Sequence, residues 1–118
     1  MKTGISIKRA YDPPSRQDGY RVLVDRLWPR GLKKEEADID EWAKALAPST
    51  ALRKWFGHDP ERWEEFRKAY REELKQNKAV APFVEQHKDK KRITLIYAGK
   101  DSAHTHALVL QAYLKRRL

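Results

Sequence analysis

The chain has 118 residues, enough for one domain, and its 26 lysines and arginines against 17 aspartates and glutamates give a net charge of +9. Hydrophobic residues make up 40% of the sequence, which suffices for one core beneath a highly charged surface. The absence of cysteine excludes disulfides, a thiolate nucleophile, iron–sulfur clusters and cysteine-ligated zinc. No apolar run approaches the roughly 20 residues of a membrane span, and no signal peptide opens the chain. We therefore expect a single domain over residues 1–118, cytoplasmic and without membrane partners.

Two short strands are predicted in the first quarter of the chain. Residues 5–9 alternate apolar and polar side chains, as a half-buried strand does. The segment from Tyr11 to Gly19 holds two prolines, two aspartates and a glycine, which predicts a loop. Residues 21–26 are rich in valine and leucine and predict a buried strand, which the Leu27-Trp28-Pro29-Arg30-Gly31 segment ends. The connection between the strands is short for a parallel crossover, so a parallel and an antiparallel arrangement both remain open.

Capping signals predict two helices between residues 38 and 57. Asp38 and Glu41 form a capping box, followed by three apolar residues on one helical face, Ile39, Trp42 and Leu46. Ser49 is a typical N-cap for the second helix, which Gly57 would end.

A longer helix is predicted from Asp59 and Pro60, a cap followed by proline at the first helical position. Its continuous apolar stripe consists of Trp63, Phe66, Tyr70 and Leu74. A weaker helix runs through Val84 to His87, and His87 is expected at the surface. The core is expected to include Trp55, Phe56, Trp63 and Phe66.

The last part of the chain predicts a strand and a helix. Residues 93–97 form the clearest buried strand, and Asp101 is expected to cap a helix that runs to the C-terminus. The buried face of this helix would carry Ala103, Ala107, Leu110 and Leu114. The alternation of strands and helices predicts an α/β fold, with a small, mostly parallel sheet of about three strands and helices packed around it.

Polar and aromatic side chains gather where the predicted strands end. In an open α/β sheet, ligands bind at the carboxyl ends of the strands, often beside a helix N-terminus. Guanidinium and ammonium groups there would bind phosphate or carboxylate through charge-assisted hydrogen bonds. The sequence thus predicts a site for a small anionic ligand, formed by Arg9, Tyr11, Arg26, Trp28, Arg30, Lys100 and Asp101.

Three titratable side chains near these strand ends are candidates for catalysis. His104 and His106 could transfer protons at neutral pH, or could be boundary residues that only bond the backbone. Asp25 could act as a base or orient Arg26 or Arg30, or it could form an ion pair that orders the turn after the strand. Because the two histidines would flank the buried stripe of the helix, they are not expected to bind a metal together. Trp28 is either a core residue or an aromatic wall for a ligand. His58 is expected to contact the start of the helix, and a catalytic role is the alternative.

Two basic runs support a second hypothesis, a nucleic-acid-binding module, and an ordinary solvated surface is the alternative to it. The runs consist of Lys88, Lys90, Lys91 and Arg92, and of Lys115, Arg116 and Arg117. The chain lacks a glycine-rich phosphate loop, a dinucleotide fingerprint and a nucleophile elbow. Nicotinamide and acyl-enzyme chemistry are therefore disfavoured, and the sequence identifies no cofactor.

Several strings resemble the YeaO-like family of small bacterial proteins of unknown function. They are Arg9-Ala10-Tyr11-Asp12, Val24-Asp25-Arg26-Leu27-Trp28-Pro29-Arg30-Gly31, Ala47-Pro48-Ser49, Leu52-Arg53-Lys54-Trp55-Phe56-Gly57-His58-Asp59-Pro60, and Tyr97-Ala98-Gly99-Lys100-Asp101 followed by His104 and His106. The resemblance implies a compact α/β fold and no established reaction, and this chain carries Gly99 and Thr105 where relatives tend to carry alanine and asparagine. Wider relatives place Cys-His-Arg at positions 105–107, so the resemblance implies that only His106 carries over and that thiol chemistry does not. A methyltransferase label found on some relatives is disfavoured, because no glycine-rich methyl-donor site is present.

Overall fold

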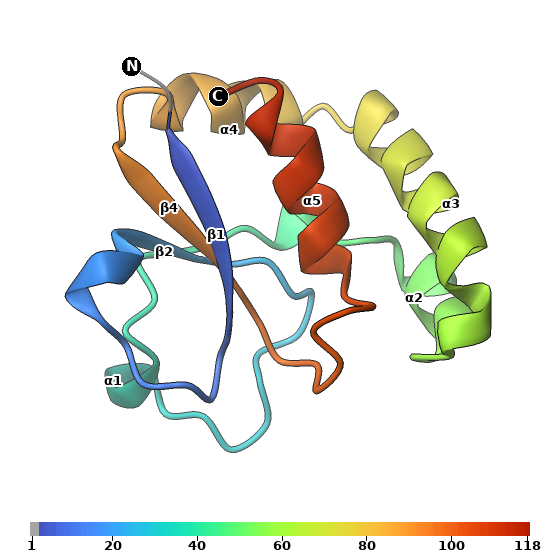
Figure 1. Cartoon of the computed structure of the whole chain (residues 1–118), viewed down its shortest axis with the longest axis horizontal. Coiled ribbons are helices and arrows are strands. Elements are labelled where there is room, and N and C mark those ends of the chain that lie inside the picture. Colours follow the sequence, from blue (N-terminus) through green and yellow to red (C-terminus); the bar gives the residue numbers. More distant parts are fainter. Residues whose placement is uncertain (1–2) are drawn as a thin grey trace.

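The computed structural model describes residues 3–118, in which four strands form one parallel sheet of order β1-β4-β2-β3 (Figure 1). The strands are β1 (Gly4–Arg9), β2 (Tyr20–Leu23), β3 (Glu41–Trp42) and β4 (Arg92–Tyr97). The predicted α/β fold with a small parallel sheet is therefore confirmed, and the short β3 adds a strand at its edge.

The direction of the first strand relative to the second is settled by the last strand. β1 and β2 do not pair with each other, because β4 lies between them and Ile93 of β4 pairs with Ile5 on one side and Tyr20 on the other. Both pairings are parallel. The minimum length of a crossover holds for two parallel strands that are neighbours in the sheet. Because β1 and β2 are not neighbours, the short loop between them is compatible with a parallel arrangement.

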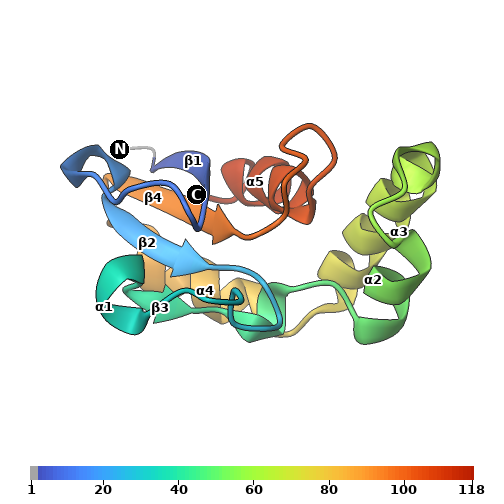
Figure 2. The same cartoon turned by 90° about the horizontal axis from the view of Figure 1, so that it is seen from below.

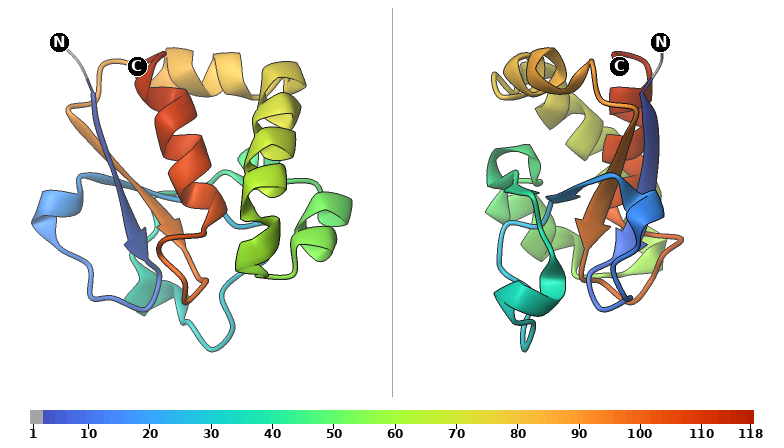
Figure 3. Two further views of the ribbon diagram at one scale, coloured as in Figure 1. Left: turned by 45° about the vertical axis from the view of Figure 1, so that its right-hand side comes forward. Right: turned by 90° about the vertical axis from the view of Figure 1, so that its left-hand side faces the viewer.

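Helices cover one face of the sheet (Figures 2 and 3). They are α2 (Thr50–Phe56), α3 (Trp63–Gln76), α4 (Val80–His87) and α5 (His106–Lys115), and a short α1 (Lys34–Ala37) follows β2. Side chains alternate along a strand, so residues 93, 95 and 97 of β4 point to the helices. Together with the stripe of Phe66, Tyr70 and Leu74 on α3 and the inner face of α5 they form the main core.

A second, smaller cluster covers the opposite face near the carboxyl ends of the strands. Leu23 and Ile96 are fully buried there. Four partly buried side chains from β3 and from the segment between β2 and β3 cover them: Trp28, Leu32, Ile39 and Trp42. The long connection from β2 to β3 thus acts as a partial second layer.

The predicted helix at residues 38–46 is wrong. Asp38 adopts a left-handed conformation with φ of 50° and ends α1, and the following residues form β3 and a 3-10 turn at Lys44–Leu46. The Ala43 N–H donates to the Leu23 carbonyl, and the Trp42 indole N–H donates to the Asp25 carbonyl. Pairing with β2 has overridden the local capping pattern, because sheet hydrogen bonds and burial outweigh helix propensity.

Two further assignments need correction. His87 is buried at 2% exposure rather than lying on the surface. Its Nδ1 lies 2.6 Å from the Phe83 carbonyl oxygen, and its Nε2 lies 2.8 Å from a Glu41 carboxylate oxygen. Trp55 is not in the core but is 40% exposed, with the Arg62 guanidinium over its ring.

A buried ionic cluster joins β1, β2 and the 3-10 turn at Arg16–Asp18. The Asp18 carboxylate accepts hydrogen bonds from Arg21 at 2.6 Å and from Lys8 at 3.1 Å, and the Arg21 side chain is only 2% exposed. Burial opposes ionisation of Asp18, but the Ser15 N–H, Lys8 and Arg21 together hold its pKa below the ordinary value of 3.8. The carboxylate is therefore ionised in the folded protein at neutral pH.

Candidate functional site

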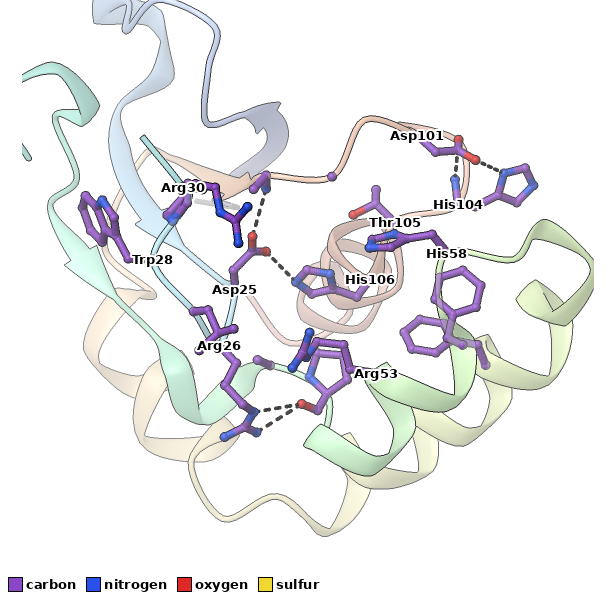
Figure 4. Close-up of a pocket in the computed structure, with 18 of the residues that line it drawn as sticks. Asp25, Arg26, Trp28, Arg30, Arg53, His58, Asp101, His104, Thr105 and His106 are labelled. Carbon is purple, nitrogen blue, oxygen red and sulfur yellow. Dashed lines mark hydrogen bonds and ion pairs between the residues drawn. The ribbon is translucent and has the colours of Figure 1, made fainter. Parts of the chain in front are cut away.

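A pocket of about 490 Å³ lies at the carboxyl ends of β2 and β4, beside the start of α5 (Figure 4). The segment after β2, the 98–106 loop and α2 supply most of its wall, and Phe56 and Phe66 line it from the main core. Its polar and charged lining residues are Asp25, Arg26, Arg30, Arg53, His58, Asp101, His104, Thr105 and His106. The pocket therefore lies at the carboxyl ends of the strands, where open α/β sheets bind their ligands.

Asp25 and His106 form a pair in the centre of the pocket (Figure 4). His106 Nε2 lies 3.2 Å from Asp25 Oδ1 and 3.0 Å from the Val24 carbonyl oxygen. The other Asp25 oxygen accepts a 3.0 Å hydrogen bond from the Ala98 N–H. One carboxylate thus connects the ends of β2 and β4 to the first residue of α5.

The contacts of His106 determine which ring nitrogen carries hydrogen. A backbone carbonyl only accepts hydrogen bonds, so Nε2 must donate to Val24. Within residues 3–118, Nδ1 has no hydrogen-bond partner, which leaves it as the atom that could exchange a proton with a ligand.

Asp25 does not orient an arginine, contrary to the expected pairing with Arg26 or Arg30. Arg26 donates twice to the Pro48 carbonyl, at 3.2 and 3.1 Å, and so ties the segment after β2 to the start of α2. Arg30 and Arg53 are exposed and line the same pocket. Across residues 3–118, none of these three arginines forms an ion pair.

His104 does not lie on a helix, because α5 begins at His106 and not after Asp101. Asp101 instead caps a turn, accepting from the N–H groups of Ala103 and His104, and its second oxygen lies 2.7 Å from His104 Nδ1. The His104 side chain and these backbone donors hold the pKa of Asp101 below its ordinary value of 3.8.

Thr105 is the N-cap of α5, and its hydroxyl accepts a hydrogen bond from the Ala107 N–H. A threonine oxygen can cap a helix as an asparagine oxygen does, so the capping role survives this replacement. Ala103, expected on the buried face of the last helix, is exposed and precedes it.

The structure separates the other predicted ligand-binding residues. Tyr11 and Trp28 line the pocket, but Arg9 and Lys100 do not. Arg9 donates to the carbonyls of Gly99 and Ala98 and lies over the Tyr11 ring, so it supports the pocket from outside. Trp28 packs against the second cluster, as one of its two expected roles requires, and it also lines the pocket.

Sequence reasoning missed Arg53 and His58 as lining residues. His58 follows the glycine that ends α2 and has a left-handed backbone with φ of 59°, a conformation uncommon for residues other than glycine. The Gly57-His58 turn carries the His58 side chain to the pocket. A histidine directly after a helix-ending glycine was the available signal for His58, whereas only its place in a string shared with the family distinguished Arg53 from other helical arginines.

The two basic runs lie at the same end of the sheet, opposite the pocket. The Gly4 N–H donates to the Lys91 carbonyl, which places the first run beside the start of β1. The C-terminus lies at the same end, near α4 and the start of β1, in Figures 1 and 3. Lys90 Nζ lies over the Tyr20 ring, and the Arg117 guanidinium lies over the Tyr113 ring.

Among residues 3–118, no helix is long and apolar enough to cross a lipid bilayer. The same residues contain no group of three or more histidine, aspartate or glutamate side chains that could hold a metal ion.

Comparison with known proteins identifies relatives along almost the whole chain. The Escherichia coli K12 protein "Uncharacterized protein YeaO" is 44% identical over 111 residues, which cover 94% of this chain and 96% of the relative. "Uncharacterized protein Rv3073c" of Mycobacterium tuberculosis H37Rv is 38% identical over 116 residues, 98% of each chain. No solved structure matches the chain significantly. The model of a family described as "Inactive DUF488-N3 subclade" matches residues 4–118, so the chain belongs to this YeaO-like family of uncharacterised proteins.

Proposed function

We propose that the protein binds a compact anionic ligand, bearing a phosphate or a carboxylate, in the pocket at the strand ends. The observation that carries the proposal is that Arg26, Arg30 and Arg53 line one pocket and have no ion-pair partner among residues 3–118. Guanidinium groups without a counter-ion that line a concave site attract an anion and bind it through charge-assisted hydrogen bonds. The N-terminus of α5 adds a favourable dipole at the same place.

Proton transfer would be the second role of the site. His106 Nε2 bonds the Val24 carbonyl and lies 3.2 Å from Asp25 Oδ1, and His104 Nδ1 lies 2.7 Å from an Asp101 oxygen, so each imidazole keeps one nitrogen for a ligand. Such carboxylate–histidine pairs are the arrangement that general acid–base catalysis uses. The family description "Inactive" favours binding over turnover, and we assign the two histidines first to ligand recognition.

The ligand proposal predicts a specific dependence on two exposed arginines. Arg30→Ala and Arg53→Ala should each weaken anion binding about tenfold, because each removes one charge-assisted hydrogen bond without touching the core. The measurement is a thermal-shift screen of phosphorylated and carboxylated metabolites, followed by calorimetric titration of those that stabilise the protein. Arg26→Ala, which also loses the bonds to Pro48, serves as a third variant.

The matched control is Arg71→Ala, an exposed arginine on α3 outside the pocket. It has the same effect on net charge and should leave binding unchanged. Equal loss in the pocket variants and in Arg71→Ala would indicate nonspecific attraction and would contradict the proposal. So would the absence of any stabilising anion.

Nucleic-acid binding is the second proposal, supported by the position of both basic runs at one end of the sheet. Binding of this kind weakens with salt, with a slope of about −0.9 per phosphate contacted on a logarithmic scale. If each of Lys90, Lys91, Arg116 and Arg117 contacts one phosphate, their replacement by alanine should reduce the magnitude of this slope by about 3.6. Fluorescence anisotropy with a labelled 20-mer duplex at increasing salt measures it. An unchanged slope, or no binding of the wild type at low salt, would exclude this function.

A further inference from the structure

The mouth of the pocket carries apolar side chains that the fold leaves exposed. Three large hydrophobic side chains are exposed among residues 3–118, and two of them, Tyr11 at 45% and Leu27 at 63%, line this pocket. The half-buried Trp28 lines it too. Apolar groups exposed at the edge of a concave site are typical of ligand contact, whereas scattered ones elsewhere need no explanation.

Both aromatic rings are held in place before any ligand arrives. The Tyr11 hydroxyl donates to the Arg30 carbonyl at 2.8 Å, and the Arg9 guanidinium lies 5.2 Å from the ring centre. The Trp28 indole N–H donates to the Leu32 carbonyl at 2.6 Å, and the ring meets Trp42 edge-on. A ligand that packs on these rings therefore loses little binding energy to side-chain ordering.

The volume of the pocket is larger than an inorganic anion requires. At about 490 Å³ it falls in the range of cavities that hold whole organic ligands. Arg30 and Arg53 account for the charged part of such a ligand and leave the wall of Tyr11, Leu27 and Trp28 without a function. A flat aromatic ring suits this wall, because it offers large apolar contact area and can meet indole and phenol rings edge-on or offset.

We propose that Tyr11, Leu27 and Trp28 form an apolar platform for an aromatic ring of the anionic ligand. The ligand class is an aromatic phosphate or carboxylate of about the size of a nucleoside monophosphate. This inference rests on the proposed anion binding, since the arginines of the same pocket hold the charged group.

Calorimetric titration with paired probes tests the platform. Phenyl phosphate should bind about tenfold more tightly than methyl phosphate, because only the former buries a ring. The pair of adenosine 5′-monophosphate and ribose 5-phosphate tests whether a nucleobase gives the same gain, and benzoate against phenyl phosphate distinguishes carboxylate from phosphate recognition.

A matched pair of variants tests whether the gain in affinity from the aromatic ring arises at the platform. Leu27→Ser should weaken phenyl phosphate binding about fivefold and leave methyl phosphate binding unchanged. The control is Trp55→Ser, which removes the third exposed hydrophobic side chain, outside the pocket, and should change neither. Both sites are exposed, so circular dichroism should show folded proteins.

The outcomes separate the two proposals. Equal affinities for methyl and phenyl phosphate, or equal effects of Leu27→Ser and Trp55→Ser, would overturn the platform and leave anion binding intact. Failure of every probe to bind the wild type would overturn anion binding and the platform with it. A ring-dependent gain that only Leu27→Ser removes supports both.

Discussion

Replacement of Asp18 by alanine is expected to lower the free energy of unfolding by about 3 kcal/mol, because it leaves the buried Arg21 guanidinium without its counter-ion. Arg21 would keep its hydrogen bonds to the Asp38 and Ala37 carbonyls, which compensate its charge only in part. Urea denaturation at pH 7 measures the loss. Lys8→Ala, which removes the more exposed cation of the cluster, should cost less than about 1 kcal/mol. Equal losses in the two variants would contradict this account.

The same cluster predicts a pH dependence. The pKa of Asp18 is lower in the folded protein than its ordinary value of 3.8, so the folded state favours the ionised form. The resulting stabilisation is fully present above the unfolded-state pKa, about 3.9, and is lost as pH falls through the folded-state pKa. The stability advantage of the wild type over Asp18→Asn should therefore shrink below about pH 4. An advantage that stays constant from pH 7 to pH 3 would show that ionisation of Asp18 does not stabilise the fold.

Phe66→Ala is expected to have the second large effect, a loss of about 4 kcal/mol of unfolding free energy. Phe66 is 2% exposed and stacks on Phe56 with ring centres 4.3 Å apart, so truncation leaves a cavity among packed rings. Because Phe66 also lines the pocket, that cavity would open into the binding site. Denaturation curves measure the loss of stability, and titration with phenyl phosphate measures the effect on the site.

Phe66→Leu provides the conservative comparison. It keeps most of the apolar volume and should cost roughly 1.5 kcal/mol, with ligand affinity close to that of the wild type. A loss below about 1 kcal/mol for Phe66→Ala would show that the ring is not well packed.

The pocket depends on one acidic residue that belongs to no regular element. Asp25 accepts the Ala98 N–H and lies against His106, so the geometry of the site follows from where β2, β4 and α5 end and begin. The sequence indicated that Asp25, His104 and His106 lie near the strand ends. It paired Asp25 with arginines, because neighbours along the chain are visible in a sequence and neighbours across a sheet are not.

Local sequence signals correctly predicted those elements whose structure depends mainly on residues close to them in the chain. The apolar run of β4, the serine cap and terminal glycine of α2, and the aspartate–proline start before α3 act within a few residues. They failed at residues 38–46, where a capping-box pattern competed with pairing to β2. They also misplaced the start of α5, because Asp101 caps a turn as readily as a helix.

The sequence by itself predicted an α/β architecture with a mostly parallel sheet, and it predicted that cationic side chains gather at the strand ends. Apolar periodicity and helix caps involve residues that are close in the chain, so the order of strands and helices can be predicted from the sequence. The tertiary structure alone decided that β4 separates β1 from β2, that Arg9 stays outside the pocket while Arg53 and His58 enter it, and that His87 is buried against Glu41. Each of these contacts joins residues far apart in the chain, and strand order and helix start positions set the direction of each side chain.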